Sequence, residues 1–208
     1  ILTLKVTGKI MCPRAVAKRR PKAITKQEVA KLWLFLVGVN QYQDQKSLPS
    51  LQYSALDCQG LGEALTEATE TFPAREIIVH HDFANHKPTV TQVRNTLNYI
   101  VNTAQPQDTI LFYFSGHGIL EASTQKVVLC LTDTYTDKLL ETGLPLQELL
   151  QCLGQCAASQ QLVWLDACHS GGMTLRGTEG AILPNPTTQL VQVLRKKAAQ
   201  SQGFYALL

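Results

Sequence analysis

Residues 108–116 read DTILFYFSG, a run of apolar side chains that stops at serine and glycine. The run shows no alternation of apolar and polar positions, which is typical of a strand with both faces buried. Residues 31–40 (KLWLFLVGVN) and 160–168 (QQLVWLDAC) have the same character. These three segments therefore predict strands of a parallel sheet covered by helices.

Amphipathic segments separate these strands. In residues 89–104, apolar side chains recur at helical spacing after Pro88. Strands that alternate with helices imply βαβ units, so we expect an α/β fold with helices on both faces of a mostly parallel sheet. Further helices are expected at 52–70, 144–156 and 189–200, and further strands at 75–81, 126–131 and 203–208.

Composition favours a single globular domain. The chain has 208 residues, of which 45% are hydrophobic and 17% charged. No apolar run approaches the roughly 18 residues that a membrane helix needs, so we expect no membrane partner. Because the first residue is Ile, we interpret the chain as trimmed, processed or a fragment, which leaves a cleaved signal peptide open.

The basic residues are concentrated at the N-terminus. Residues 1–31 hold nine Lys or Arg against one acidic residue, while the remainder holds ten basic and fifteen acidic residues. Such an arm can contact nucleic acid or anionic lipid, or it can be a solvated or strand-forming extension. No nucleic-acid-binding motif accompanies it, so we favour the second interpretation and expect no nucleic-acid partner.

The six cysteines form no disulfide or zinc pattern. No CxxC occurs, and several cysteines, such as Cys130 and Cys152, lie inside apolar segments. There a cysteine serves as a small hydrophobic side chain. This usage predicts a reduced, cytoplasmic protein.

Two motifs close buried strands with reactive residues. SGHG (115–118) ends one strand, and DACHSGG (166–172) ends another. Ligands of parallel α/β sheets bind beyond the carboxyl ends of the strands. The two motifs are therefore expected to share one rim of the sheet.

A thiol becomes a competent nucleophile when a nearby imidazole takes its proton. His169 is adjacent to Cys168 in sequence, but adjacent side chains of a strand point to opposite faces. We therefore favour His117 as the base for Cys168, with the backbone N–H groups of Cys168 and Gly118 as oxyanion donors. A zinc site formed by the cysteine and both histidines matches no common spacing, so no metal site is expected.

Five stretches together resemble the caspase-like cysteine peptidases (clan CD, C14 type), most closely the large (p20) catalytic subunit of metacaspases and orthocaspases. The resemblance covers residues 32–208 and implies a caspase-like three-layer αβα sandwich with a mostly parallel central sheet, preceded by the arm 1–31. The stretches are LFLVGVNQYQD (34–44), LPSLQYSALDCQGL (48–61), ILFYFSGHG (110–118), VVLCLTDT (127–134) and LVWLDACHSGG (162–172).

The resemblance implies an endopeptidase that acts through an acyl-enzyme, with Cys168 as nucleophile and His117 as base. It also implies peptide or protein substrates with Arg or Lys at P1, bound by Asp166, Ser115 and Asp57. A cationic P1 side chain requires such carboxylates in a partly desolvated pocket. For Asp57, a surface or helix-capping role is the alternative.

The sequence departs from the family pattern in two ways. Family members continue into a small (p10-like) subunit, so we interpret this chain as ending before or at the start of that part, its expected partner. Calcium-dependent members carry an acidic cluster where this sequence has only Asp133 and Asp137. A strong calcium site needs more oxygen ligands, so we predict calcium independence and no cofactor.

Self-cleavage at basic residues is a further hypothesis from the resemblance. The arm could instead lie across the cleft as an inhibitory segment, giving a latent zymogen. A catalytically silent caspase-like module is the alternative function, although both Cys168 and His117 are present. A nucleotide-binding domain is not favoured, because the sequence contains neither GxGxxG nor GxxxxGK(S/T), the glycine motifs of such domains. The candidate processing sites are Arg195, Lys196, Lys197, Arg14, Lys18, Arg19 and Arg20.

Overall fold

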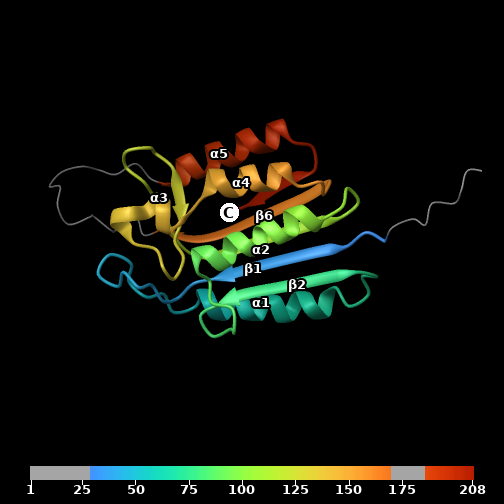
Figure 1. The fold of residues 1–208 in the computed structure, drawn as a ribbon, viewed down its shortest axis with the longest axis horizontal. Coiled ribbons are helices and arrows are strands. Elements are labelled where there is room, and N and C mark those ends of the chain that lie inside the picture. The colour runs from blue at the N-terminus through green and yellow to red at the C-terminus, as the bar shows by residue number, and fades with distance from the viewer. Residues whose placement is uncertain (1–28, 170–185) are drawn as a thin grey trace, which may run out of the picture.

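The computed structural model describes residues 29–169 and 186–208, and within them one mixed sheet is flanked by helices (Figure 1). The strands are β1 (Leu32–Gly38), β2 (Arg75–His81), β3 (Thr109–Leu120), β4 (Val127–Leu129), β5 (Leu144–Pro145), β6 (Gln160–His169) and β7 (Phe204–Leu207). The helices are α1 (Ser54–Ala68), α2 (Val90–Thr103), η1 (Thr136–Lys138), α3 (Leu139–Thr142), α4 (Leu146–Gln155) and α5 (Pro186–Gln200).

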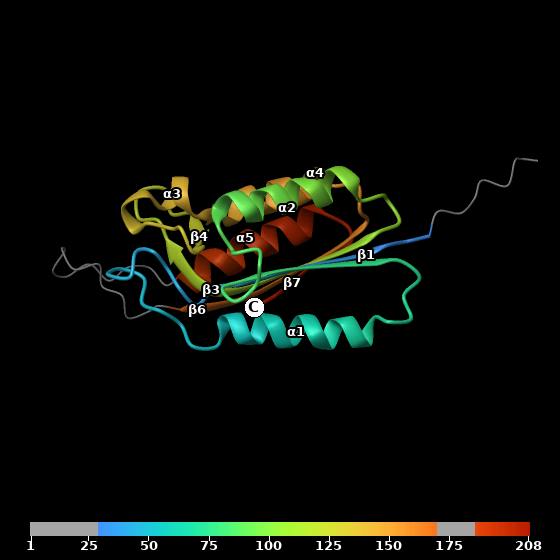
Figure 2. The same cartoon turned by 60° about the horizontal axis from the view of Figure 1, so that its bottom comes forward.

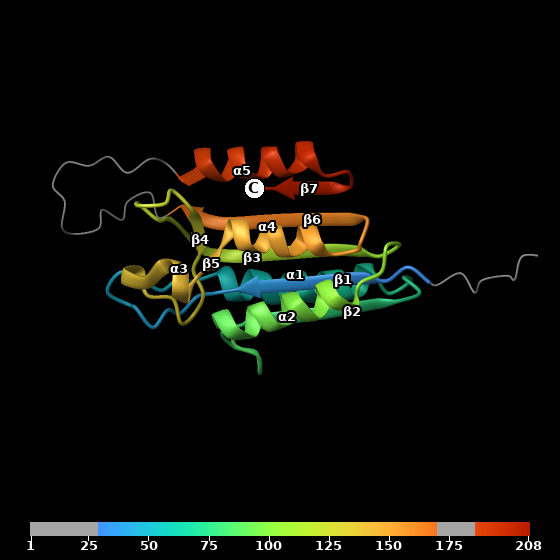
Figure 3. The same ribbon diagram turned by 45° about the horizontal axis from the view of Figure 1, so that its top comes forward.

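Five strands form a parallel sheet in the order β2-β1-β3-β6-β7 (Figure 3). β3 is the longest and lies at the centre. Its first part, Thr109–Ser115, pairs with β1 on one side, and β6 pairs along Thr109–Gly118 on the other. Beyond the end of β1, Gly118–Leu120 pairs with β4 in antiparallel fashion, and β4 pairs with β5.

The helices form two layers. α1 covers one face of the sheet, and α2, α4 and α5 cover the other (Figure 2). Alternate residues of β1 serve the two layers: Phe35 belongs to the main core under α2 and α4, whereas Leu36 belongs to a smaller cluster with Cys58 of α1 and Tyr113 of β3. The α/β sandwich expected from the sequence is therefore confirmed.

The contact between α1 and β1 depends on a glycine. A Cβ atom on Gly38 would collide with the side chain of Cys58 and the backbone oxygen of Ser54. Gly38 therefore lets the first turn of α1 lie directly against the carboxyl end of β1.

The expected helices and strands are confirmed, with boundaries shifted by a few residues. The segment 136–145, which contains η1, α3 and β5, carries structure that the sequence pattern did not predict. The described cysteines are free, and both Cys58 and Cys130 are fully buried, as expected of small apolar side chains. In residues 29–169 and 186–208, no helix is long and apolar enough to cross a membrane.

Candidate active site

The two motifs meet at the carboxyl ends of β3 and β6. In the parallel register between these strands, His117 is the partner of Cys168, Ser115 the partner of Asp166, and Gly118 the partner of His169. The shared rim expected from the sequence is therefore present. Residues at paired positions share one face of a pleated sheet, so His117 and Cys168 occupy the face that α1 covers.

His169 lies one residue further along β6 than Cys168. Successive positions of a strand alternate between faces, so His169 occupies a position on the opposite face from Cys168. The side chains of Cys168 and His169 lie outside the described part of the structure. The backbone register alone favours His117 over His169 as the partner of Cys168.

The imidazole of His117 is held by the loop 39–53. Its Nε2 lies 2.8 Å from the carbonyl oxygen of Pro49. Since a carbonyl only accepts, Nε2 carries the proton and donates it. In the neutral ring Nδ1 is then unprotonated, and this atom is buried without a hydrogen-bond partner among the described residues. The ring therefore has the tautomer that a base acting through Nδ1 requires.

Burial also affects the charge of His117, which is only 3% exposed. Desolvation lowers the pKa of the imidazole, and the hydrogen bond to Pro49 opposes this shift only in part. The ring is therefore neutral, and able to accept a proton, at neutral pH.

The loop 39–53 is itself tied to its surroundings. The side chain of Asn40 accepts a hydrogen bond from the N–H of Ala55 (2.8 Å) and donates one to the carbonyl of Gln52 (3.1 Å). The N–H of Gln43 donates to the carbonyl of Thr132 (2.8 Å). These bonds hold the Pro49 carbonyl in place over the rim.

Three residues predicted for the pocket lie around the phenol of Tyr113. Ser115 is buried, and its hydroxyl donates a long hydrogen bond (3.4 Å) to Asp166, which is exposed. Burial is the main cause that raises the pKa of Tyr113 to about 12; Ser115 lowers it, and the carboxylates of Asp166 and Asp57 raise it further. Asp57, exposed on the first turn of α1, is thus close enough to act on the same phenol.

The sequence patterns did not single out Pro49 or Tyr113. Pro49 contributes a backbone carbonyl, which carries no residue signature. Its signal is positional: the polar loop QYQDQKSLPS (41–50) directly follows β1 at the rim that holds both motifs.

A family model for the caspase domain of C14 peptidases matches residues 31–205. The chain belongs to the caspase domain family. Among solved structures, this caspase domain is similar to protein GSU0716 from Geobacter sulfurreducens, with a TM-score of 0.53 and 17% identity. The match covers 83% of this chain and 66% of that one, and at this identity it concerns the fold alone. No curated protein matches the chain.

Asp133 and Asp137, the two aspartates considered as calcium ligands, have different surroundings in this caspase domain. The carboxylate of Asp133 accepts a hydrogen bond (2.8 Å) from the N–H of Val90 at the start of α2, whereas Asp137 lies exposed in η1. Within the described ranges, no group of three or more His, Cys, Asp or Glu side chains could hold a metal ion.

The candidate processing sites fall into two sets. Arg195, Lys196 and Lys197 lie within α5, where the first two are exposed. A peptidase binds its substrate as an extended chain, so cleavage there requires α5 to unwind locally. The arm sites Arg14, Lys18, Arg19 and Arg20 lie outside the described residues.

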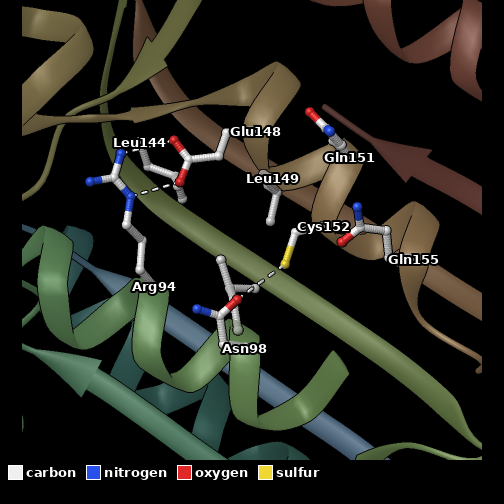
Figure 4. A pocket seen from close by; sticks show the side chains of 9 residues that line it. Arg94, Asn98, Leu144, Glu148, Leu149, Gln151, Cys152 and Gln155 are labelled. Atoms are coloured by element: carbon white, nitrogen blue, oxygen red, sulfur yellow. Dashed lines mark hydrogen bonds and ion pairs between the residues drawn. The ribbon is translucent and has the colours of Figure 1, made fainter. Parts of the chain in front are cut away.

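A groove of about 290 Å³ lies between α2 and α4 (Figure 4), which cover the face of the sheet opposite α1 (Figure 2). The guanidinium of Arg94 forms a two-point ion pair with Glu148 (2.7 and 2.8 Å), which raises the pKa of the arginine. The thiol of Cys152 lies 3.8 Å from the amide oxygen of Asn98. The groove contains none of the residues of the candidate active site.

Proposed function

We propose that this caspase domain is a cysteine endopeptidase that cleaves after Arg or Lys by means of Cys168 and His117. The observation that carries the proposal is the cross-strand pairing of these two residues, combined with the buried, unprotonated Nδ1 of His117. Membership in the caspase domain family supports cysteine peptidase chemistry in general.

In the proposed reaction, Nδ1 of His117 accepts the proton of the Cys168 thiol, and the thiolate attacks the scissile carbonyl carbon. The backbone N–H groups of Gly118 and Cys168 stabilise the oxyanion. When the C–N bond breaks, His117 returns the proton to the leaving amine. Water, deprotonated by the same nitrogen, then hydrolyses the thioester and releases the acid.

Specificity for a cationic P1 side chain rests on charge. The carboxylates of Asp166 and Asp57 both raise the pKa of the Tyr113 phenol, which supports a region of negative charge on the face that carries the dyad positions. An aspartate at P1 would be repelled there, whereas a guanidinium or ammonium group would be paired.

A panel of fluorogenic peptides that differ only at P1 (Arg, Lys, Asp and Ala) tests this proposal, with Cys168→Ala as the control variant. We expect cleavage of the Arg and Lys peptides by the wild type and none by the variant. Cleavage after Asp alone would overturn the specificity. Folded wild type that cleaves no peptide would instead indicate a latent zymogen or a silent module.

Self-processing and calcium independence belong to the same proposal. Asp133 is engaged at the start of α2, which supports activity that a chelator leaves unchanged. Mass spectrometry of the wild type and of Cys168→Ala, each incubated with calcium or with EDTA, tests both points. Identical fragments in the two proteins would contradict self-cleavage, and fragments that need calcium would contradict independence.

A further inference from the structure

One side chain of the loop 39–53 contacts the candidate base at two points. The hydroxyl of Tyr42 accepts a hydrogen bond (2.9 Å) from the backbone N–H of His117. Its aromatic ring lies against the imidazole, with 4.9 Å between ring centroids and a tilt of 36°. Tyr42 is only 2% exposed, and its hydroxyl donates to the carbonyl of Val39 (3.1 Å).

We infer that Tyr42 is a positioning residue for the general base: its hydroxyl fixes the backbone of His117, and its ring fixes the plane of the imidazole and keeps water from it. The inference deepens the proposed peptidase function and rests on it for its kinetic consequences. Its structural content, the control of the imidazole by Tyr42, stands without any peptidase activity.

The hydroxyl of Tyr42 supplies a hydrogen-bond acceptor at a point where β3 has no neighbouring strand to supply one. Along this edge of β3, pairing with β1 ends at Ser115, and the carbonyl of Ser115 accepts a hydrogen bond from the N–H of Val39. Pairing with β4 begins only at Gly118. The carbonyl of His117 accepts from Cys130, but no strand supplies an acceptor for its N–H. Because a buried N–H without an acceptor is costly, the phenol takes the place of a neighbouring strand at this residue.

The glycine before the base makes room for this contact. A Cβ on Gly116 would lie 3.1 Å from the hydroxyl oxygen of Tyr42 and 2.9 Å from the ring of Phe114. A side chain there would force the phenol or the phenylalanine to move. The glycine of SGHG thus allows the tyrosine to reach the backbone of His117.

The loop 39–53 contacts both the imidazole and the backbone of His117. Pro49 accepts from Nε2, and Tyr42 accepts from the backbone N–H and covers the ring. A single hydrogen bond at Nε2 leaves the ring free to tilt about that bond, and the tyrosine ring removes this freedom. Nδ1 therefore stays directed to one place on the rim.

The two parts of Tyr42 predict different effects. Tyr42→Phe keeps the ring but removes the acceptor, so kcat should fall about tenfold with KM within about twofold, a barrier increase of about 1.4 kcal/mol. Tyr42→Ala also admits water beside the imidazole, so the pKa of His117 should rise towards its ordinary value. On β6, the titratable residues at positions on the same face as His117 include Cys168, its paired position, and Asp166 two residues earlier, while burial and the Pro49 carbonyl are the causes that act on the pKa of the imidazole.

NMR titration of histidine-labelled protein tests the inference without a substrate. The proteins are wild type, Tyr42→Phe, Tyr42→Leu and Tyr42→Ala, with His117→Asn to assign the signal. We expect the His117 pKa to rise in the Ala and Leu variants and to stay unchanged in the Phe variant. If the Ala variant does not fold, the Leu variant, which retains apolar bulk, carries the same test.

Kinetics per active site, with sites counted by an Arg chloromethyl ketone, form the second arm. Equal His117 pKa values in all folded variants, together with an unchanged kcat in Tyr42→Phe, would overturn the inference. An inactive wild type whose His117 pKa still depends on Tyr42 would indicate a latent zymogen or a silent module and would still support the positioning role. A merely structural role would lower the count of active sites but change neither kcat per site nor the pKa.

Discussion

The two ring nitrogens of His117 have different surroundings, and this difference defines the candidate base. The Pro49 carbonyl fixes the proton on Nε2, and burial keeps the ring neutral. A backbone carbonyl thus orients the imidazole, a role that a carboxylate side chain performs in many other hydrolases. Unlike a carboxylate, the carbonyl adds no negative charge that would raise the pKa of the ring strongly.

The lowered pKa of His117 predicts the acid limb of the pH profile. The base must be neutral, so kcat/KM should fall as the pH drops through its folded-state pKa, which lies below the ordinary value of about 6.5. Measurement of kcat/KM on an Arg peptide between pH 4 and 8 checks this. The exposed His86→Asn variant should show the same limb, and a midpoint above pH 6.5 in the wild type would contradict the prediction.

His80 predicts acid sensitivity of the fold. It is 2% exposed, and burial, with a smaller effect of His86, lowers its pKa to about 4. Between pH 6.5 and 4 the unfolded chain therefore binds a proton that the folded protein does not. Stability should be lost on acidification across this window, by up to about 3 kcal/mol.

Urea unfolding at pH 7 and pH 4.5 measures this loss. His80→Leu should lose less stability than the wild type on acidification, whereas His86→Asn should behave much as the wild type does. An equal loss in the wild type and His80→Leu would assign the acid sensitivity to other groups.

Asp166 is expected to determine P1 preference. Asp166→Asn keeps the shape of the side chain but removes the charge that would pair with a cationic substrate. The value of kcat/KM for an Arg peptide should fall about 10- to 100-fold, as expected for the loss of a charged hydrogen bond. Asp137→Asn, which removes an exposed carboxylate in η1, is the matched control; equal effects of the two changes would argue for a general charge effect.

At the scale of elements, the close approach of α1 to β1 brings Asp57 towards the phenol of Tyr113. This approach depends on the absence of a side chain at Gly38. α1 also contains Gly60, where an added Cβ would have no neighbour within 4 Å. Gly38 and Gly60 are therefore under opposite constraints.

Alanine at these two glycines should act in opposite directions. Gly38→Ala overpacks the contact with Cys58 and should lower the free energy of unfolding by about 1–3 kcal/mol. Gly60→Ala should raise it by about 0.5–1 kcal/mol, because alanine loses less conformational freedom in a helix. Chemical denaturation measures both, and a neutral Gly38→Ala would show that α1 can shift without cost.

At the scale of the whole molecule, the sheet separates the candidate active site from the groove between α2 and α4. The dyad positions lie on the face covered by α1, and Cys152 lies among the helices of the other face. The thiol of Cys152 is also poorly ionised, because burial, and to a lesser extent Glu148 and Cys156, raise its pKa.

Replacement of Cys152 should therefore leave catalysis intact. Cys152→Ser should keep kcat/KM on an Arg peptide within about twofold of the wild type. Iodoacetamide should inactivate the variant as fast as it inactivates the wild type. Cys168→Ala, which lacks the proposed nucleophile, should be inactive before iodoacetamide is added. Slower inactivation of the Cys152→Ser variant would show that the groove communicates with the active site.

Local sequence patterns were enough to predict the described strands other than β5, most of the helices and the meeting of the two motifs. Long apolar runs have few alternatives to buried parallel strands, and parallel strands carry their carboxyl ends to one rim. The choice of His117 over His169 also followed from the alternation of side chains in a strand. The register between β3 and β6 agrees with that choice at the level of the backbone.

The surroundings of His117 follow from long-range packing and could not be predicted from local sequence patterns. The Pro49 carbonyl and the hydroxyl and ring of Tyr42 come from a segment whose local pattern says nothing of the base. A backbone carbonyl is present at every residue, and a tyrosine in a polar loop has no periodicity to reveal its partner. Their roles arise because the loop 39–53 folds back over the rim, and long-range packing rather than local preference determines that path.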